Sequence, residues 1–318
     1  PEIIERAALA MAEIKDLRFI PTLIRHLKLR GGRPTIREAI VSLGEPALDA
    51  LDEALRDPNA DPRLRLHLPR TIARFGSQRA AEILLRTLSS DPSGSVRYKA
   101  LKGLAWLVTH YKVKLDSARV ESEIHKSLLE HVRLLGLSVV IEQGHPNDEE
   151  KTQGVIGVVL GLLADKLAQS LERAFRLLQI AHRHEDLRGV YAAVLSDDKR
   201  ERANAVEFLD ALSRVGRAGL PAPGRELLRL VVDDLPADER LSRASELASA
   251  APASYEAALA SLMDDTDDAL AGLATYHAHE VGGAALLAQV AASLKRRPAL
   301  RPFYGVTLEA LETTHAGA

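Results

Sequence analysis

Apolar residues recur at every third or fourth position along most of the chain, and no convincing run alternates apolar with polar residues. The first spacing places apolar side chains on one face of an α-helix, whereas a half-buried strand needs the second. Residues that cap and terminate helices interrupt the pattern, as in GGRP (31–34), GEP (44–46), DP (57–58 and 61–62) and DPSG (91–94). The chain is therefore predicted to be all-α, with helices of about 10–15 residues joined by short turns.

One helical pattern repeats in the first third of the chain. Ile36, Ile40 and Leu43 form an apolar series closed by glycine; the series starting at Leu68 repeats it 32 residues later, and Val96 starts a third 28 residues further on. A second apolar helix follows over 47–55 and 80–88, and residues 2–29 read as an earlier pair. Because one helix pair cannot bury its apolar stripe alone, we predict stacked antiparallel helix pairs, a HEAT-type α-solenoid, over 1–112.

The spacing changes after about residue 112. Two long helices are predicted over 117–143 and 148–181, and shorter ones over 184–195 and 198–213. A glycine- and proline-rich stretch then precedes a tail with 18 alanines between residues 237 and 294. We predict a bundle-like C-terminal extension in two parts. A long-helix and helix-pair segment spans 113–215, and an Ala-rich segment of thin, closely packed helices spans 216–318.

Composition narrows the possible chemistry. The 318 residues include no cysteine, which excludes disulfides, thiol nucleophiles and Cys-ligated metal sites. The formal net charge is −2, but residues 1–112 carry 19 basic and 13 acidic side chains, against 23 and 31 in the remainder. The basic surplus of the first part is modest and is consistent with docking on an acidic surface.

Two histidine groups and one acidic cluster are candidates for metal or acid–base chemistry. HRHED (182–186) lies at a predicted helix junction, whereas HAHE (277–280) falls within a helix, where residues two apart point about 200° apart. The cluster DDTDD (264–268) lacks the spacing of a calcium-binding loop and is expected to cap a helix in solvent. We expect no catalytic residue, no metal site and no cofactor. A base-excision glycosylase or a His-metal hydrolase is the enzymatic alternative.

Basic residues are concentrated in the predicted repeats. Equivalent positions of stacked repeats line up, so arginines within 61–102 can form a ridge along one face. We expect first that they pair with acids of the next repeat, such as Asp91, or are solvated. In the other interpretation, the ridge binds an acidic protein, a lipid surface or nucleic-acid phosphates. An exposed Trp106 would mark a binding groove, whereas a buried one belongs to the core. The candidate binding residues are Arg63, Arg65, Arg70, Arg74, Arg97 and Trp106.

Several sequence blocks resemble a known family. They are DPRLRLHLPRTIARFG (61–76), DPSGSVRYKAL (91–101), LERAFRLL (171–178), DLRGVY (186–191) and RANAVEFLD (202–210). Over roughly residues 15–213 the chain resembles the soluble HEAT-repeat region of bacterial major-facilitator-type transporters related to ADP/ATP translocases. The resemblance implies a cytoplasmic appendage for interaction or regulation, at the cytoplasmic face of the inner membrane if the parent is a transporter. It implies no catalytic residue.

Membrane insertion and enzymatic activity are not expected of this segment. No run reaches the roughly 18–20 consecutive apolar residues that a transmembrane helix needs. The sequence starts with Pro1, without a signal-peptide pattern, so we expect a piece of a longer protein. The sequence thus predicts a non-enzymatic protein-interaction or regulatory scaffold whose partner is another protein or another domain of its parent chain. The alternative is a nucleic-acid-binding protein that uses the arginines of 61–102.

Overall fold

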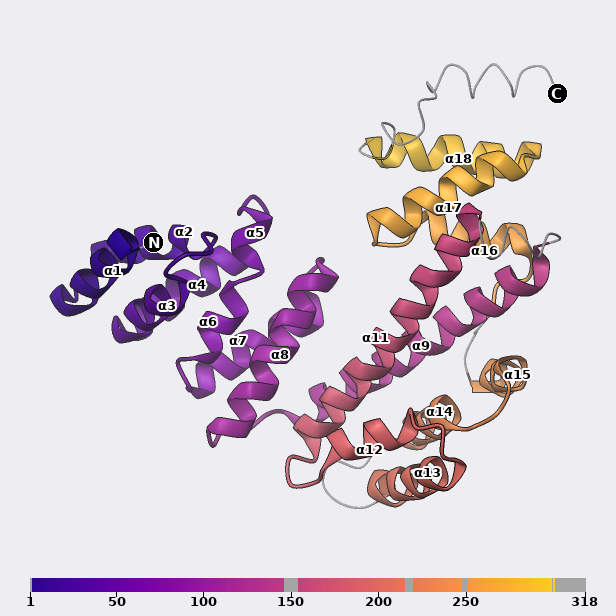
Figure 1. Cartoon of the computed structure of the whole chain (residues 1–318), viewed down its shortest axis with the longest axis horizontal. Coiled ribbons are helices and arrows are strands. Elements are labelled where there is room, and N and C mark those ends of the chain that lie inside the picture. Colours follow the sequence, from indigo (N-terminus) through magenta and orange to yellow (C-terminus); the bar gives the residue numbers. More distant parts are fainter. Residues whose placement is uncertain (1, 146–153, 215–219, 248–250, 299, 301–318) are drawn as a thin grey trace. The chain divides into compact units, whose positions relative to one another are not determined.

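The computed structural model of the chain is all-helical (Figure 1). It describes all residues except 1, 146–153, 215–219, 248–250, 299 and 301–318, and the described part contains no strand. The predicted all-α class is confirmed. The start of the helix predicted from residue 148 and part of the glycine- and proline-rich stretch before the alanine-rich tail lie outside the described residues.

The chain forms two compact units. The first, unit 1, comprises residues 1–124 and 173–192, and the second, unit 2, comprises 125–172 and 193–318. The long helices α9 (Ser117–Gly144) and α11 (Val155–Ala181) each contribute to both units. Whether the three segments predicted from the sequence are domains stays a prediction.

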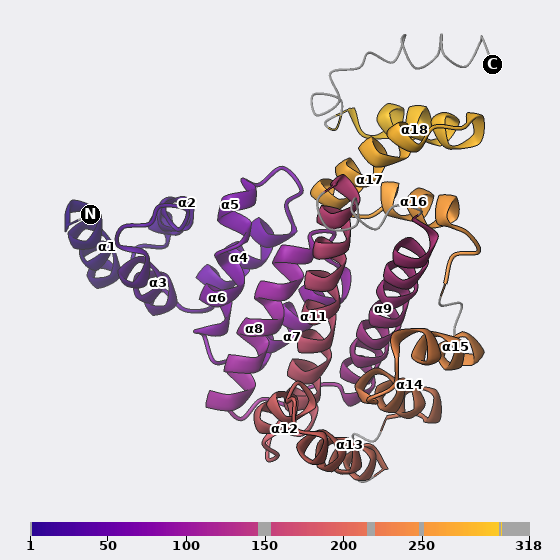
Figure 2. The same ribbon diagram turned by 45° about the vertical axis from the view of Figure 1, so that its right-hand side comes forward.

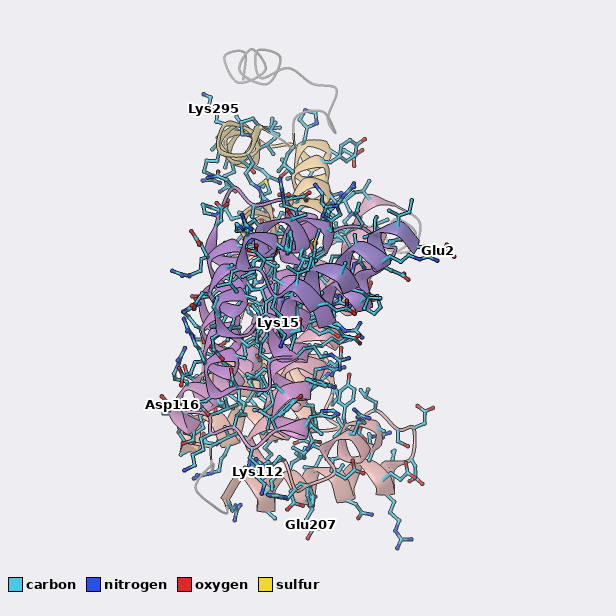
Figure 3. The ribbon with its side chains drawn as sticks, turned by 90° about the vertical axis from the view of Figure 1, so that its left-hand side faces the viewer. Glu2, Lys15, Lys112, Asp116, Glu207 and Lys295 are labelled. Carbon is cyan, nitrogen blue, oxygen red and sulfur yellow. The ribbon has the colours of Figure 1, made fainter. Side chains whose placement is uncertain are left out.

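Unit 1 begins with a series of short helices. They are α1 (Glu2–Ile14), the 3-10 turn η1 (Leu17–Phe19), α2 (Ile20–His26), α3 (Arg33–Ser42), α4 (Glu45–Arg56), α5 (Pro62–Arg65), α6 (Leu68–Ala73), α7 (Gln78–Ser90) and α8 (Gly94–His110). Glu2 and Lys15 mark the two ends of α1 in Figure 3. The second helices predicted over 47–55 and 80–88 are confirmed as α4 and α7.

Capping residues explain where these helices begin. The side chains of Asp61, Ser77 and Ser93 accept backbone N–H groups at the starts of α5, α7 and α8, because the first turn of a helix leaves its N–H groups without partners. Between α3 and α4 the chain reverses at Gly44, whose φ of 73° favours glycine. The helix boundaries are therefore set by local chemistry.

The helices contact both their neighbours in the chain and helices further along it. The most extensive contact is between α7 and α8, and α1 also contacts α3, α6 contacts α8 and α2 contacts α4. Ile36, Ile40, Leu68 and Ile72, which mark the repeated apolar series, are fully buried. Burying such side chains is the main source of stability of a helical protein, at roughly 1.5–3 kcal/mol for each.

A glycine allows α6 and α8 to approach closely. The two helices lie side by side in Figures 1 and 2. A Cβ atom added at Gly103 of α8 would lie 3.0 Å from the Pro69 carbonyl oxygen and 3.5 Å from Ala73 Cβ. A larger side chain at this position therefore has to push the two helices apart.

Gly103→Leu is expected to lower the free energy of unfolding by about 2–3 kcal/mol, because overpacking a closed contact strains the helices around it. Urea unfolding followed by the fluorescence of Trp106, the only tryptophan, measures this locally, since both residues lie in α8. Gly161→Leu in α11 is the control, because nothing lies within 4 Å of a Cβ added there, and it is followed by far-UV circular dichroism because residue 161 belongs to unit 2. Equal unfolding midpoints for the two variants would contradict the close approach.

The segment between α8 and α9 is not helical. Lys112 and Asp116 bracket it in Figure 3. The side-chain amide of Gln78 in α7 binds both backbone groups of Lys114 in this segment. Its Nε2 donates to the Lys114 carbonyl oxygen at 2.7 Å, and its Oε1 accepts a hydrogen bond from the Lys114 N–H at 2.9 Å. The predicted change near residue 112 thus coincides with a break between helices.

Unit 2 contains α13 (Lys199–Arg214), α14 (Ala222–Val232), α15 (Ala237–Leu247), α16 (Tyr255–Met263), α17 (Asp268–Val281) and α18 (Ala284–Arg296), besides parts of α9 and α11. Its core joins leucines and valines of the two long helices to α16, α17 and α18. Ala258, Ala271, Ala274 and Ala278 are fully buried in this core. Small side chains at these positions let the helices pack closely, as the alanine-rich tail predicts.

The hydropathy of the helices bears on the expectation that this segment does not insert into a membrane. Within the part of the chain that the structure describes, every helix is too short or too polar to cross a membrane.

Candidate functional site

The six candidate binding residues lie on three helices of unit 1. Arg63 and Arg65 are in α5, Arg70 and Arg74 are in and directly after α6, and Arg97 and Trp106 are in α8. Their side chains have different environments, and the structure divides them into two groups.

Arg65 belongs to the interior. Its Nη2 donates to Asp91 Oδ2 at 2.6 Å, and its Nε and Nη2 donate to the Leu55 carbonyl oxygen at 3.2 and 3.1 Å. The two charged side chains are 13% and 6% exposed. Arg65 therefore joins the end of α4 to the start of α8, and it is unavailable to a partner.

Other arginines of the predicted ridge are also occupied. Arg97 donates to the Asp91 and Pro92 carbonyl oxygens at 2.6 and 3.1 Å, so it holds the start of its own helix. Arg79 and Arg86 of α7 pair with acidic residues of α4, Arg79 with Asp49 and Glu45, and Arg86 with Asp52. Ion pairs between helices, the first interpretation from the sequence, therefore account for Arg65, Arg79 and Arg86, whereas backbone carbonyl groups account for Arg97.

Arg70 and Arg74 remain accessible. They are exposed and one helical turn apart, and no hydrogen bond or ion pair of either guanidinium is found among the described residues. The Arg74 guanidinium lies over the Trp106 ring, 4.7 Å from its centroid. Trp106 is half-buried, and its ring stacks on His110 with the centroids 4.4 Å apart. Trp106 thus makes a cation–π contact with an exposed arginine.

Arg37 of α3 is a residue that the sequence analysis missed. It is only 8% exposed, and its Nε is buried without a hydrogen-bond partner in the described structure. Burial, followed by the charges of Arg70, Arg33 and Arg74, lowers its pKa to about 10. The repeated pattern contains a weak signal for this residue, because Ile36-Arg37 occupies the same position in its repeat as Val96-Arg97 does in the later one.

His67, at the start of α6, has the same neighbours. Its pKa is lowered by burial and then by the charges of Arg33, Arg37 and Lys99. The charges that act on His67 and on Arg37 are therefore all positive. We name this group the basic cluster: Arg33, Arg37, His67, Arg70, Arg74 and Lys99.

Some of the candidates for metal or acid–base chemistry make structural contacts. Among the described residues, no three or more His, Asp or Glu side chains are placed to hold a metal ion. His277 is buried in α17, where its Nε2 lies 2.7 Å from the Tyr255 hydroxyl oxygen. His277 and His279 lie on one helix, as predicted.

The acidic cluster at 264–268 corrects one expectation. Asp267 caps α17 as predicted, accepting the N–H groups of Ala269 and Leu270. Asp265, however, is buried and accepts hydrogen bonds from Lys166 at 3.1 Å and from Arg133 at 3.2 Å. The solvated role expected for this residue was wrong, because α9 and α11 supply cations from positions far away in the sequence.

Comparison with known proteins assigns no family. No protein-family model and no curated protein matches this sequence.

Proposed function

We propose that this chain is a non-enzymatic interaction module that binds an acidic partner protein through the basic cluster. The observation that carries the proposal is the environment of Arg37. This cation is buried, and the charged residues that lower its pKa are other arginines. Such a group raises the free energy of the unbound protein, and an anionic partner would lower it.

A HEAT-type arrangement of unit 1 is part of this proposal. It is supported by the repeated apolar series and by the contacts of α1 with α3 and of α6 with α8. In stacked repeats the same face of successive first helices is presented to a partner. From the resemblance to transporter-associated HEAT regions we further propose a cytoplasmic segment of a larger protein, which regulates that parent chain or recruits a partner to it.

An acidic protein suits this surface better than a nucleic acid does. Ion pairs and carbonyl contacts occupy Arg65, Arg79, Arg86 and Arg97, so the free cations do not continue along the helices as a phosphate-tracking groove requires. Binding of single strands also needs several aromatic rings to stack on the bases, and Trp106 is already stacked on His110.

The double substitution Arg70→Ala/Arg74→Ala is expected to abolish partner capture while the melting temperature changes by less than about 2 °C, because the free energy of folding depends little on exposed, unpaired side chains. Capture is measured from a nuclease-treated lysate of the source organism by comparing the proteins retained by the two chains. Arg79→Ala/Arg86→Ala is the matched control, since it removes the same charge from ion pairs in the same unit.

The outcomes separate the candidate functions. Proteins retained by the wild type and the control, but lost with Arg70→Ala/Arg74→Ala, support the proposal. Retention that is equal for all three chains contradicts it. Binding of a labelled oligonucleotide at about 50 mM salt that weakens steeply with added salt would instead favour the nucleic-acid alternative.

A further inference from the structure

The first helix of unit 1 has an apolar stripe that faces solvent. Among the large apolar side chains of the described residues, Ile3 and Ile14 of α1 have the largest exposed fractions, 83% and 64%. Ala7 and Ala10 of the same helix are also exposed. We name the stripe formed by Ile3, Ala7, Ala10 and Ile14 the α1 seam. It presents to water the kind of side chains that usually lie between packed helices.

The α1 seam lies away from the side of α1 that packs on its own unit. α1 contacts α3, and the side that is covered is that of Ala8, which is only 2% exposed. Ile4 is on the same side, since its Cγ2 lies 3.6 Å from a Cβ added at Gly32, directly before α3. Successive residues of a helix are about 100° apart, so the seam points roughly 100–160° away from Ala8. In Figure 3, α1 is the foremost ribbon of unit 1.

The spacing of the α1 seam is that of a contact between two helices. Its members follow one another at steps of four, three and four residues, as the a and d positions of a coiled coil do. If two copies of α1 pack antiparallel, a residues lie opposite d residues. Ile3 of each copy then faces Ile14 of the other, and Ala7 faces Ala10. The small side chains in the middle let the helices approach closely, while the isoleucines close both ends of the contact.

The charges beside the seam favour this antiparallel arrangement. Arg6 and Glu13 both precede an a position, so they lie on the same edge of the seam. Both are exposed, and no hydrogen bond or ion pair of either side chain is found among the described residues. In an antiparallel pair these edges meet, so Arg6 of each copy lies beside Glu13 of the other. In a parallel pair they would meet the opposite edge, where the apolar Ile4 and Met11 stand.

We propose that α1 binds α1 of a second copy of this chain through the α1 seam, in an antiparallel contact with two-fold symmetry. An anionic lipid surface suits this helix less well, because α1 carries three glutamates and one arginine. The helix is 13 residues long, so the contact is small and a dissociation constant of roughly 10–100 µM is expected. No residue of the basic cluster lies in α1, so this inference is independent of the proposed function.

Self-association is measured by sedimentation velocity of the full chain at concentrations from about 2 to 200 µM. Ile14→Gln is expected to weaken it at least tenfold, because a symmetric dimer contains each change twice. The matched control is Leu9→Gln, which removes another exposed apolar side chain of α1 outside the seam and should leave the dimer unchanged. The melting temperatures of dilute samples show whether either variant disturbs the monomer.

The antiparallel pairing is tested by reversing the charges at the edge of the seam. Arg6→Glu and Glu13→Arg each place like charges opposite one another, so each variant alone is expected to associate at least fivefold more weakly than the wild type. An equimolar mixture of the two variants restores both ion pairs and should form a heterodimer. Arg63→Glu, which makes the same charge change at an exposed position of α5, is the control.

A reversible dimer that is weakened by Ile14→Gln, unchanged by Leu9→Gln and restored by mixing the two charge variants supports the inference. A chain that stays monomeric at all concentrations overturns it and assigns the α1 seam to another segment of a longer chain or to a different partner. Dimers that Ile14→Gln does not weaken overturn it too. Charge variants that associate no better mixed than alone overturn the antiparallel pairing.

Discussion

Replacing Arg65 with methionine is expected to lower the free energy of unfolding by about 3 kcal/mol, because it leaves the buried Asp91 carboxylate without its cation. The substitution also removes the two donors that reach the Leu55 carbonyl oxygen at the end of α4. A buried charge without a partner destabilises a protein far more than an exposed ion pair stabilises it. Urea unfolding followed by Trp106 fluorescence reports this change, since Trp106 and Asp91 both lie in unit 1.

Two comparisons isolate the cause of that loss. Arg79→Ala breaks an ion pair whose side chains are about half exposed, and it is expected to lower the free energy of unfolding by less than about 1 kcal/mol. Adding Asp91→Asn to Arg65→Met removes the stranded charge while preserving an acceptor for the Ser93 N–H, so part of the stability should return. A double variant no more stable than Arg65→Met alone would show that packing, rather than charge, is responsible.

The second large effect is expected from acidification. His131 of α9 is 6% exposed, and its Nδ1 lies 2.9 Å from Ser170 Oγ and 3.2 Å from the Leu167 carbonyl oxygen. Burial, followed by the charge of Arg240, lowers its pKa to about 4 from an ordinary value of 6.5. The unfolded chain therefore takes up a proton on this imidazole at a higher pH than the folded chain does.

The direction of the effect follows from proton linkage. The contribution of His131 to the free energy of unfolding is fully present above pH 6.5 and is lost as the pH falls from 6.5 through about 4. The loss is about 2 kcal/mol between pH 7 and pH 5 and about 3 kcal/mol by pH 4. Urea unfolding followed by far-UV circular dichroism at pH 7 and pH 5 measures it, because this signal includes the helices of unit 2.

His131→Gln is expected to be less sensitive to pH than the wild type, since glutamine does not take up the proton. The matched control is His184→Gln, which removes an exposed histidine and should preserve the wild-type dependence. Identical pH dependence of the wild type and His131→Gln would contradict the assignment to this imidazole.

The candidate site shows where reasoning from sequence stops. Arg63 and Arg65 are two residues apart in α5, yet one is exposed and the other lies in a buried ion pair. Both look like surface residues in the sequence, because an arginine on a short helix is usually solvated. Arg37 was overlooked for the same reason, since its place in the repeat, where Val96-Arg97 stands later in the chain, gives only a weak signal of its burial.

Helix positions were predictable from the residues near them. The apolar spacing of Ile36 and Ile40 and the capping groups of Asp61 and Ser93 act over distances of a few residues, so the sequence contains both partners of each interaction close together. The same is true of Asp267, whose capping of α17 was expected. Fold class and most helix boundaries follow from such short-range interactions.

The partners of charged side chains were decided by tertiary packing. Arg65 meets Asp91 26 residues later, and Arg133 meets Asp265 132 residues later. Neither distance is related to a helical period, so the pairing exists only once whole helices have packed against one another. Tertiary packing likewise decides whether an arginine is neutralised by such a pair, as Arg65 is, or lies buried with an Nε that has no partner among the described residues, as Arg37 does.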